Sequence, residues 1–326
     1  MNMINPARVL CIGEILFDYL ADQPGRSLEQ VASWTAYPGG APANVASGLV
    51  KLGIPSALIS AVGMDEGGNQ LLQVLQQVGV QTSGIQQYST APTRQVFVLR
   101  SDEGEREFAG FGERQSNEFA DTLLQASQIP EKLFLDADFL VLGTLALAYP
   151  QSREAIIHAL KMADRYNLKI LVDINWRPVF WSNPLDARRF IPDLLKQVDF
   201  VKLSAEEAEL FFNTTDPISI HSQLDSIEGV MITDGQKGCS YSLGEFQGKI
   251  PAFAVNVVDT TGAGDAFVAG FIHQIYQYGI RGLNDPETMQ KMIIYALAVA
   301  ALTVTKPGAF TAQPTEADVE AFLKSF

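Results

Sequence analysis

Short apolar runs alternate with longer amphipathic segments through most of the chain, and this alternation restricts the possible folds more than any other feature. Runs typical of buried strands lie at 9–12, 56–62, 139–142, 169–172, 200–203 and 230–233. Segments with helical spacing of apolar residues lie between them, at 43–52, 69–78 and 152–166. Strands that alternate with helices predict βαβ units joined by right-handed crossovers. We therefore expect an α/β fold: a three-layer, doubly wound, mainly parallel sheet.

Two segments interrupt this alternation. The segment 95–111 has β-type residues on both sides of a Ser-Asp-Glu-Gly turn at 101–104, which predicts a hairpin. The segment 26–37 is polar and has no helical pattern. We interpret both as strands of a small inserted β lid, from about 14–38 and 93–113. No long linker or repeat is visible, so we expect a single α/β domain over 1–326.

The composition excludes some functions. Apolar residues make up 47% of the chain and charged residues 18%, enough apolar material for a large core. With 37 acidic and 23 basic residues, the net charge of −14 opposes binding to nucleic acid or to an anionic membrane. The apolar run 292–304 is shorter than the roughly 20 residues that span a bilayer, so we expect a buried helix there. No secretory signal is visible, and Cys11 and Cys239 are expected to be buried free thiols, so we expect a cytoplasmic protein.

A glycine-rich turn near the C-terminus is the most informative local feature. An apolar strand runs into Asp259, Thr260 and Thr261, and Gly262-Ala263-Gly264 then leads into a helix that Gly279 closes. Glycines before a helix let backbone N–H groups converge on one point, where the helix dipole favours negative charge. Asp265 beside this anion hole would repel a phosphate. It suits a base that takes a proton from a hydroxyl while the N–H groups hold the developing charge.

Other interpretations of this turn are weaker. An ordinary turn with an acid near the helix start explains Asp265 alone. The dinucleotide fingerprint Gly-x-Gly-x-x-Gly opens the first βα unit, whereas here Phe267 stands at the third glycine, late in the chain. Neither the Walker sequence nor Gly-x-Ser-x-Gly occurs, and the three histidines show no metal-ligand spacing. A phosphoryl-transfer site of another kind fits best.

Polar residues elsewhere extend this prediction. The Gly39-Gly40 pair lets a ligand approach the backbone closely, which favours a binding role for Asp18 and Asn44 over a solvated acid and a helix cap. Residues 173, 175 and 177, which are Asp, Asn and Arg, follow a predicted strand at a spacing of two. An extended backbone would point all three to one side at the edge where ligands of α/β sheets bind. A polar loop with a tryptophan anchor is the alternative.

Two segments resemble the signatures of one known family. Residues 259–267 (Asp-Thr-Thr-Gly-Ala-Gly-Asp-Ala-Phe) are similar to the C-terminal signature of the ribokinase-like (PfkB) carbohydrate kinases, and residues 39–46 are similar to their N-terminal signature. The two lie about 220 residues apart in the usual order. Residues 173–177 resemble the Asp-x-Asn-x-Arg pattern of fructokinases, whereas ketodeoxygluconate kinases more often have proline where Ile174 stands.

This resemblance implies an ATP-dependent sugar kinase that phosphorylates the 6-hydroxyl of D-fructose. Kinases for 2-keto-3-deoxygluconate, ribose or a riboside are alternatives within the family, and a non-catalytic sugar- or nucleotide-binding regulator is an alternative outside it. Asp265 would be the catalytic base, and the backbone of Gly262, Ala263 and Gly264 would form the anion hole. The implied sugar-binding residues are Asp18, Gly39, Gly40, Asn44, Arg177 and Asp265.

The resemblance also implies ATP and metal sites. The implied ATP-binding residues are Ser204, Thr233, Gly235, Gly238, Gly264 and Gly308. Glu207 lies in a segment similar to the family's Asn-x-x-Glu motif, with Ser204 in place of Asn, and would act on Mg²⁺ through water. Asp259 and the Thr261 carbonyl match positions that bind a monovalent cation such as K⁺.

One departure from the family concerns the lid. Gly110 and Gly112 stand where typical fructokinases have bulkier residues, which affects the expected sugar more than the chemistry. Lid strands in this family often pair across a dimer, so the resemblance also implies a homodimer.

Overall fold

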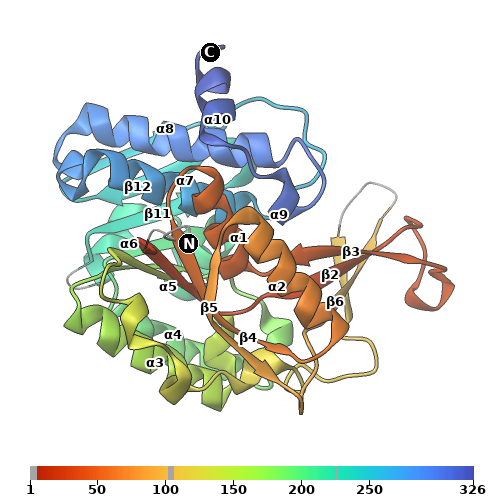
Figure 1. Ribbon diagram of the computed structural model, residues 1–326. Helices are drawn as coiled ribbons and strands as arrows, with labels where there is room; N and C mark the ends of the chain where they lie inside the picture. The colour runs from red at the N-terminus through yellow and green to blue at the C-terminus, as the bar shows by residue number, and fades with distance from the viewer. Residues whose placement is uncertain (1–5, 102–105, 225–226) are drawn as a thin grey trace.

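A nine-stranded sheet lies at the centre of the computed structural model, which describes residues 6–101, 106–224 and 227–326 (Figure 1). The strand order is β13 (Phe246–Ile250), β12 (Cys239–Leu243), β11 (Gly229–Thr233), β10 (Phe200–Ser204), β9 (Lys169–Asp173), β8 (Phe139–Leu142), β1 (Val9–Ile12), β4 (Ser56–Gly63) and β5 (Gln81–Tyr88). Neighbouring strands are parallel from β11 to β5, and β12 and β13 add an antiparallel hairpin at one edge. The mainly parallel sheet predicted from the sequence is confirmed.

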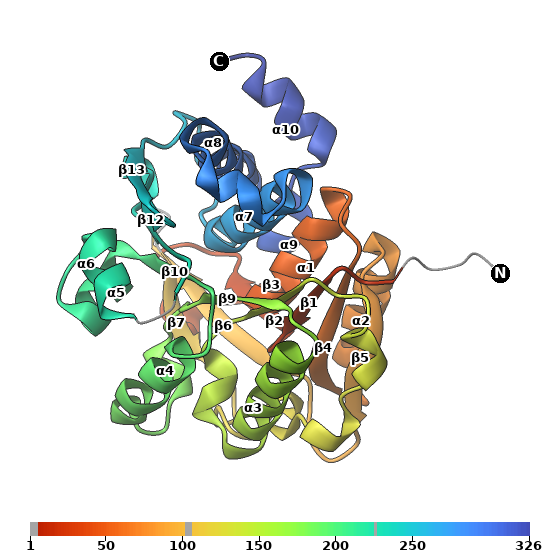
Figure 2. The same cartoon turned by 90° about the vertical axis from the view of Figure 1, so that its left-hand side faces the viewer.

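Helices cover both faces of this sheet (Figure 2). One face packs against α1 (Ala41–Lys51), α2 (Glu66–Val78), α7 (Ala263–Tyr278) and α8 (Pro286–Thr303). The other packs against α3 (Pro150–Arg165), α4 (Ala187–Leu195), α5 (Ala205–Phe212) and α6 (Pro217–Gln223). Side chains alternate between these two cores along each strand, since successive residues of a strand point to opposite faces. The predicted three-layer, doubly wound architecture is therefore confirmed.

The start of one helix differs from the predicted start, because the residues that cap it lie outside the apolar run. The helix predicted at 292–304 starts six residues earlier, as α8, where the Asp285 side chain accepts a hydrogen bond from the Thr288 N–H at 2.8 Å and Pro286 takes the first helical position. The helices α4, α5 and α6 had no predicted counterpart, and neither did two short C-terminal helices, α9 (Ala309–Ala312) and α10 (Glu316–Leu323). Cys11 and Cys239 are buried and free, as expected. Among the described residues, no helix is both long and apolar enough to cross a membrane.

A second sheet of four strands stands beside the first. Its order is β3 (Trp34–Gly39), β2 (Leu16–Ala21), β6 (Gln95–Arg100) and β7 (Arg106–Gly110), and we call it the lid sheet. β6 and β7 form the predicted antiparallel hairpin, although its turn at 101–104 lies outside the described residues except for Ser101. The segment 26–37 is only partly a strand, because a 3-10 helix (Leu28–Gln30) precedes β3. The assignment of the chain to one domain stays a prediction.

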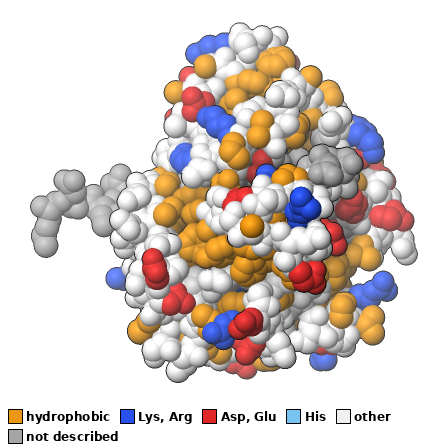
Figure 3. All heavy atoms as spheres, turned by 90° about the vertical axis from the view of Figure 1, so that its right-hand side faces the viewer, with side chains coloured by type: hydrophobic (Ala, Val, Ile, Leu, Met, Phe, Trp, Pro, Cys, Tyr) orange, Lys and Arg blue, Asp and Glu red, His pale blue; other side chains and the backbone are white. Residues whose placement is uncertain are grey.

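The two faces of the lid sheet differ in character. On one face, the half-buried rings of Tyr19, Trp34 and Phe97 pack together, with ring centroids 5.1 Å apart for Tyr19–Phe97 and 5.0 Å for Trp34–Phe97. The side of the molecule from which the lid sheet projects carries a broad band of hydrophobic side chains (Figure 3). The opposite face carries Asp18 and Tyr37, which are paired across β2 and β3. This second face is turned toward the start of α9, where a Cβ added to Gly308 would lie 3.1 Å from the Tyr37 ring.

Candidate active site

The glycine-rich turn forms the N-terminus of α7, as the sequence predicts. Gly262 has a left-handed φ of +75°, and a Cβ there would lie 2.5 Å from the Ala309 Cβ, so this position requires glycine. The first intrahelical bond of α7 runs from the Ala266 N–H to the Gly262 carbonyl, so the N–H groups before it have no acceptor within the helix. The Ala263 N–H is turned toward the Thr260 carbonyl at 3.3 Å. The positive end of the helix dipole therefore lies at Gly264 and Asp265.

Asp265 is buried in the first turn of α7 and is only 8% exposed. Its Oδ2 accepts a hydrogen bond from the Asn44 Nδ2 of α1 at 2.8 Å. Burial and the nearby Asp173 carboxylate raise the pKa of Asp265 to about 6, against the lowering effects of Asn44, Lys202 and Arg177. A general base works best when its pKa lies near the operating pH, so this carboxylate is suited to take a proton at neutral pH.

A buried ion pair lies beneath this turn. The Lys202 Nζ of β10 is 3.1 Å from both carboxylate oxygens of Asp173, at the end of the neighbouring strand β9. A Cβ added to Gly264 would lie 2.6 Å from the Lys202 Nζ, so a larger residue there would displace the Lys202 ammonium group or the turn. The sequence pattern predicted no function for Lys202. The signal that could have found it is a lysine inside the apolar run 200–203, where a buried charge requires a partner.

The prediction that residues 173, 175 and 177 point to one side of an extended backbone is wrong. β9 ends at Asp173, Ile174 is buried, and Asn175 has a left-handed φ of +41° that turns the chain. Asp173 is only 4% exposed. Arg177, in contrast, is exposed, and its Nη1 donates a hydrogen bond to the Trp176 carbonyl at 2.9 Å. The Arg177 guanidinium still lies close enough to contribute to lowering the pKa of Asp265.

The predicted sugar-binding residues gather around the turn between β3 and α1. A Cβ added to Gly39 would lie 2.5 Å from the Asp18 Oδ2, and one added to Gly40, whose φ is +104°, would lie 2.6 Å from a backbone carbonyl. The Gly39-Gly40 pair therefore lets this turn pack directly against β2. Asn44, in the first turn of α1, is 3% exposed, and its Oδ1 has no hydrogen-bond partner within the described part of the chain. The turn thus brings Asp18 and Asn44 to the same end of the sheet as Asp265.

Glu14 is a second buried charge that the sequence analysis missed. It is 4% exposed, and its Oε1 accepts a hydrogen bond from the Ala41 N–H at 3.1 Å, at the start of α1. This contact replaces the missing cap, because the N-cap residue Gly40 has no side chain. Burial, followed by the charges of Asp121 and Asp265, raises the pKa of Glu14 to about 7. The sequence signal that could have indicated this buried acid is a glutamate between Gly13 and Ile15, within an apolar stretch.

On the other side of α7, the predicted nucleotide and magnesium residues lie at strand ends. Ser204 and Glu207 form a capping box at the start of α5, in which the Glu207 Oε2 accepts from the Ser204 N–H at 2.7 Å. The other Glu207 oxygen accepts from the Trp176 N–H at 2.5 Å. Thr233, Gly235 and Gly238 lie at the turn between β11 and β12. Glu207 is thereby held rigidly, with its oxygens facing backbone donors.

Asp259 joins two segments of this region. Its Oδ1 accepts from the Thr261 N–H at 2.9 Å and from the Thr261 Oγ1 at 2.8 Å, and its Oδ2 accepts from the Gly308 N–H at 2.8 Å. Among the described residues, no group of three or more His, Cys, Asp or Glu side chains could hold a metal ion.

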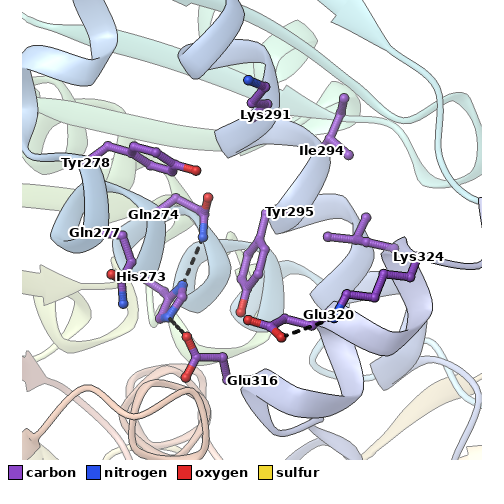
Figure 4. A pocket seen from close by; sticks show the side chains of 11 residues that line it. His273, Gln274, Gln277, Tyr278, Lys291, Ile294, Tyr295, Glu316, Glu320 and Lys324 are labelled. Carbon is purple, nitrogen blue, oxygen red and sulfur yellow. Dashed lines mark hydrogen bonds and ion pairs between the residues drawn. The ribbon is translucent and has the colours of Figure 1, made fainter.

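A separate pocket lies at the opposite end of α7 (Figure 4). It measures about 680 Å³ and is lined by side chains of α7, α8 and α10. His273, only 2% exposed, has its Nε2 3.4 Å from the Glu316 carboxylate, and its ring stacks on Tyr295 with centroids 4.9 Å apart. None of the predicted site residues lines this pocket, so it is distinct from the site around Asp265.

A buried carboxylate at a helix N-terminus, with glycine N–H groups beside it, is an arrangement for moving a phosphoryl group onto a hydroxyl. The class that the fold and this site define is a kinase of the α/β/α type with a β lid. A family model described as "pfkB family carbohydrate kinase" matches residues 6–316. The chain belongs to the pfkB family of carbohydrate kinases and is a sugar kinase.

Relatives of known name agree with this assignment. Fructokinase-1 of Oryza sativa subsp. japonica is 32% identical over 320 residues, covering 97% of this chain and 98% of the relative. The crystal structure of a fructokinase with bound ATP from Xylella fastidiosa is similar with a TM-score of 0.87 and 29% identity, covering 97% of this chain and 98% of that one. A fructokinase from Vibrio cholerae, solved with fructose, ADP and calcium ion, is similar with a TM-score of 0.81 and 28% identity, covering 97% and 99%.

Proposed function

We propose that the protein transfers the γ-phosphoryl group of ATP to the 6-hydroxyl of D-fructose. The observation that carries this proposal is the buried Asp265 carboxylate at the positive end of α7, held by Asn44. In the proposed reaction, Asp265 takes the proton of the 6-hydroxyl, and the oxygen attacks the γ-phosphorus of ATP. The bond between that phosphorus and the β,γ-bridging oxygen breaks, and ADP leaves with the electron pair.

The anion hole of Gly262, Ala263 and Gly264 would stabilise the charge that develops during this transfer. In phosphoryl transfer, positioning and charge stabilisation supply most of the rate enhancement. The Ala263 N–H already faces a carbonyl, so we assign the larger share to the N–H groups of Gly264 and the residue after it. The net charge of −14 is no obstacle, because phosphate recognition rests on backbone donors rather than on basic side chains.

Asp18, Gly39, Gly40 and Asn44 are proposed to bind the sugar, with Arg177 facing either sugar or phosphate oxygens. Asp18 lies on the lid-sheet face that is turned toward the site, beside Gly39. A carboxylate accepts hydrogen bonds from sugar hydroxyls, and the Asn44 Oδ1 is an acceptor with no partner within the described residues. Two similar solved structures are fructokinases, one of them with fructose bound, which supports fructose as the substrate.

ATP is proposed to lie against Ser204, Thr233, Gly235, Gly238, Gly264 and Gly308. These residues lie at the C-terminal ends of β10 and β11, in the turn before β12, and at the starts of α7 and α9. Mg²⁺, when bound, would neutralise the phosphates, with Glu207 reaching it through water. A monovalent cation such as K⁺ near Asp259 and the Thr261 carbonyl remains a prediction.

A substrate panel tests the proposed function. Purified protein is assayed for ADP production with fructose, ribose, 2-keto-3-deoxygluconate and a riboside, with ATP and Mg²⁺ present. We expect fructose to have the highest kcat/KM. A tenfold or greater preference for ribose or another sugar would contradict fructose as substrate. No turnover with any sugar, together with binding of sugar and nucleotide, would favour a non-catalytic regulator.

We also propose a homodimer formed through the lid sheet. The half-buried Tyr19, Trp34 and Phe97 give the lid sheet an apolar face that a second copy could cover. Sedimentation velocity should give a mass of twice the monomer, and Trp34→Ser with Phe97→Ser should give the monomer. A monomeric wild-type protein would exclude this assembly.

A cytoplasmic location likewise stays a prediction.

A further inference from the structure

The Lys202–Asp173 pair is an uncommon feature, because both charges are almost fully buried. The side chains are 8% and 6% exposed, and the two residues lie opposite each other in the register of β10 and β9. Removing two charges from water costs about as much as their attraction returns, so apolar residues could stabilise the sheet equally well. The pair therefore invites an explanation beyond stability.

Its position suggests that explanation. A Cβ added to Gly264 would lie 2.6 Å from the Lys202 Nζ and 3.7 Å from the Asp173 Oδ2. Both charges thus lie directly under the backbone of the first turn of α7, one residue away from Asp265. Neither can move far, since each is the other's hydrogen-bond partner at 3.1 Å.

We propose that Lys202 and Asp173 are positioning residues that together set the charge state of Asp265: Lys202 favours the carboxylate form and Asp173 opposes it. This inference rests on the proposed function, in which Asp265 is the base. A base with too low a pKa accepts the proton weakly, and one with too high a pKa is already protonated at neutral pH. Two neighbouring groups of opposite charge hold the base between these limits.

Several other groups also face Asp265. From α1, Asn44 donates a hydrogen bond, and from the loop after β9, Arg177 contributes an exposed positive charge. From β1 and the loop after it, the Cys11 thiol and the Glu14 carboxylate each interact with Asp265 electrostatically. Burial and Asp173 raise the pKa of Asp265, whereas Asn44, Lys202 and Arg177 lower it. Of the two positive groups, Lys202 is buried, whereas Arg177 is exposed, so water screens the charge of Arg177 more strongly.

The test compares two substitutions that remove opposite charges while keeping side-chain volume. Lys202→Met should move the acidic limb of the kcat/KM–pH profile upward by about one pH unit or more, because Asp265 loses a nearby positive charge. Asp173→Asn should move the same limb downward, because Asp265 loses a nearby negative charge. The double variant should return the limb close to the wild-type position. The sugar that the substrate panel selects is used throughout.

A matched control comes from the other end of β9. Lys169 also bridges two carboxylates, with its Nζ 2.7 Å from the Asp199 Oδ1. It is half-buried, however, and lies at the N-terminal end of β9, away from Asp265. Lys169→Met should lower the melting temperature without moving the acidic limb. Shifts of both site variants in the same direction, or no shift in either, would overturn the proposal and leave the pair a structural one.

Two further measurements keep the outcomes distinct. If Lys202→Met does not fold, as judged by circular dichroism, Asp173→Asn alone decides, because an upward or unchanged limb contradicts the proposal. Failure of the proposed function is recognised separately: Asp265→Asn would then retain turnover, whichever way the limb moves in the other variants.

Discussion

The start of α7 and the lid sheet contribute to the same site in different ways. Around Asp265, the functional side chains are almost fully buried and held by short hydrogen bonds, and Gly262 and Gly264 have no room for a Cβ. In the lid sheet, Asp18 is half-buried, Phe108 is exposed, and a Cβ added to Gly110 would meet nothing within 4 Å. The start of α7 is tightly constrained, whereas the outer part of the lid sheet is not.

This difference suggests how substrate choice and chemistry are separated in the chain. A buried network tolerates few changes, because each removed partner leaves a charge or donor unsatisfied. A half-exposed sheet can exchange side chains at little cost in stability. We therefore expect substitutions at the start of α7 to lower kcat with any sugar, and substitutions in the lid sheet to change the KM for the sugar. The four predictions that follow test this separation.

The largest effect is expected for Asp265→Asn. The amide can keep the contact with the Asn44 Nδ2 but cannot take a proton, so kcat should fall by about 10²–10⁴-fold with little change in either KM. The measurement is ADP production at saturating ATP and sugar, with the melting temperature as the control for folding. A variant that keeps more than a tenth of the wild-type kcat would show that Asp265 is not the base.

The next largest effect is expected for Gly264→Ala. The new Cβ would lie 2.6 Å from the Lys202 Nζ, so either the Lys202 ammonium group or the first turn of α7 must shift, and a displacement of about 1 Å in the site can cost about 10²-fold in rate. The matched control is Gly67→Ala in the first turns of α2, where the nearest atoms lie at 3.6 Å. The control should keep full activity and be stabilised by up to about 1 kcal/mol. Equal loss of kcat in both variants would contradict a special requirement at Gly264.

The sequence could predict the parts of this site that repeat a local pattern. Apolar periodicity located the parallel strands β1, β4 and β8–β11 and half of the helices, and the glycine-rich turn located Asp265, because both depend on neighbours along the chain. The signatures at 39–46 and 259–267 identified the family that the comparisons then confirmed. The lid hairpin also followed from local alternation.

The parts that escaped prediction depend on contacts between distant segments. Lys202 on β10 pairs with Asp173 on the neighbouring strand β9. Glu14 caps α1 from a loop 27 residues earlier in the sequence. The left-handed Asn175 is a further case, because the spacing of the polar residues suggested an extended chain. Local patterns indicate which face of an element is buried, whereas the partner of a buried charge is defined only when the sheet is assembled.

In the lid sheet, Asp18→Asn is expected to act on sugar binding. A hydrogen bond to a charged group contributes about 1.5–3 kcal/mol, so the KM for fructose should rise by roughly ten- to hundredfold while kcat changes little. The matched control is Asp22→Asn, since Asp22 is exposed just beyond the end of β2 and bonds to Thr35. Steady-state kinetics at saturating ATP give both constants. An unchanged KM in Asp18→Asn would remove this residue from the sugar site.

The smallest effect is expected for Phe108→Ala on β7. The Phe108 ring, 37% exposed, packs against Phe111 with centroids 5.0 Å apart and against Phe180 of the main body with centroids 6.5 Å apart. Aromatic pairs of this kind contribute about 0.5–1.5 kcal/mol, so losing the contact between lid and body should raise the KM for the sugar by a few-fold to about tenfold. Steady-state kinetics should show an unchanged KM for ATP, because none of the residues proposed to bind the nucleotide lies on β6 or β7.

The Phe108 variant gives the most sensitive test of the separation between lid and body. Phe108→Leu keeps most of the apolar area and should restore most of the affinity for sugar. If Phe108→Ala instead lowered kcat as strongly as it raised the KM, the contact between Phe108 and Phe180 would have to act on the transferred group as well. The lid sheet would then be part of the catalytic machinery, and the independence of substrate choice from chemistry would not hold.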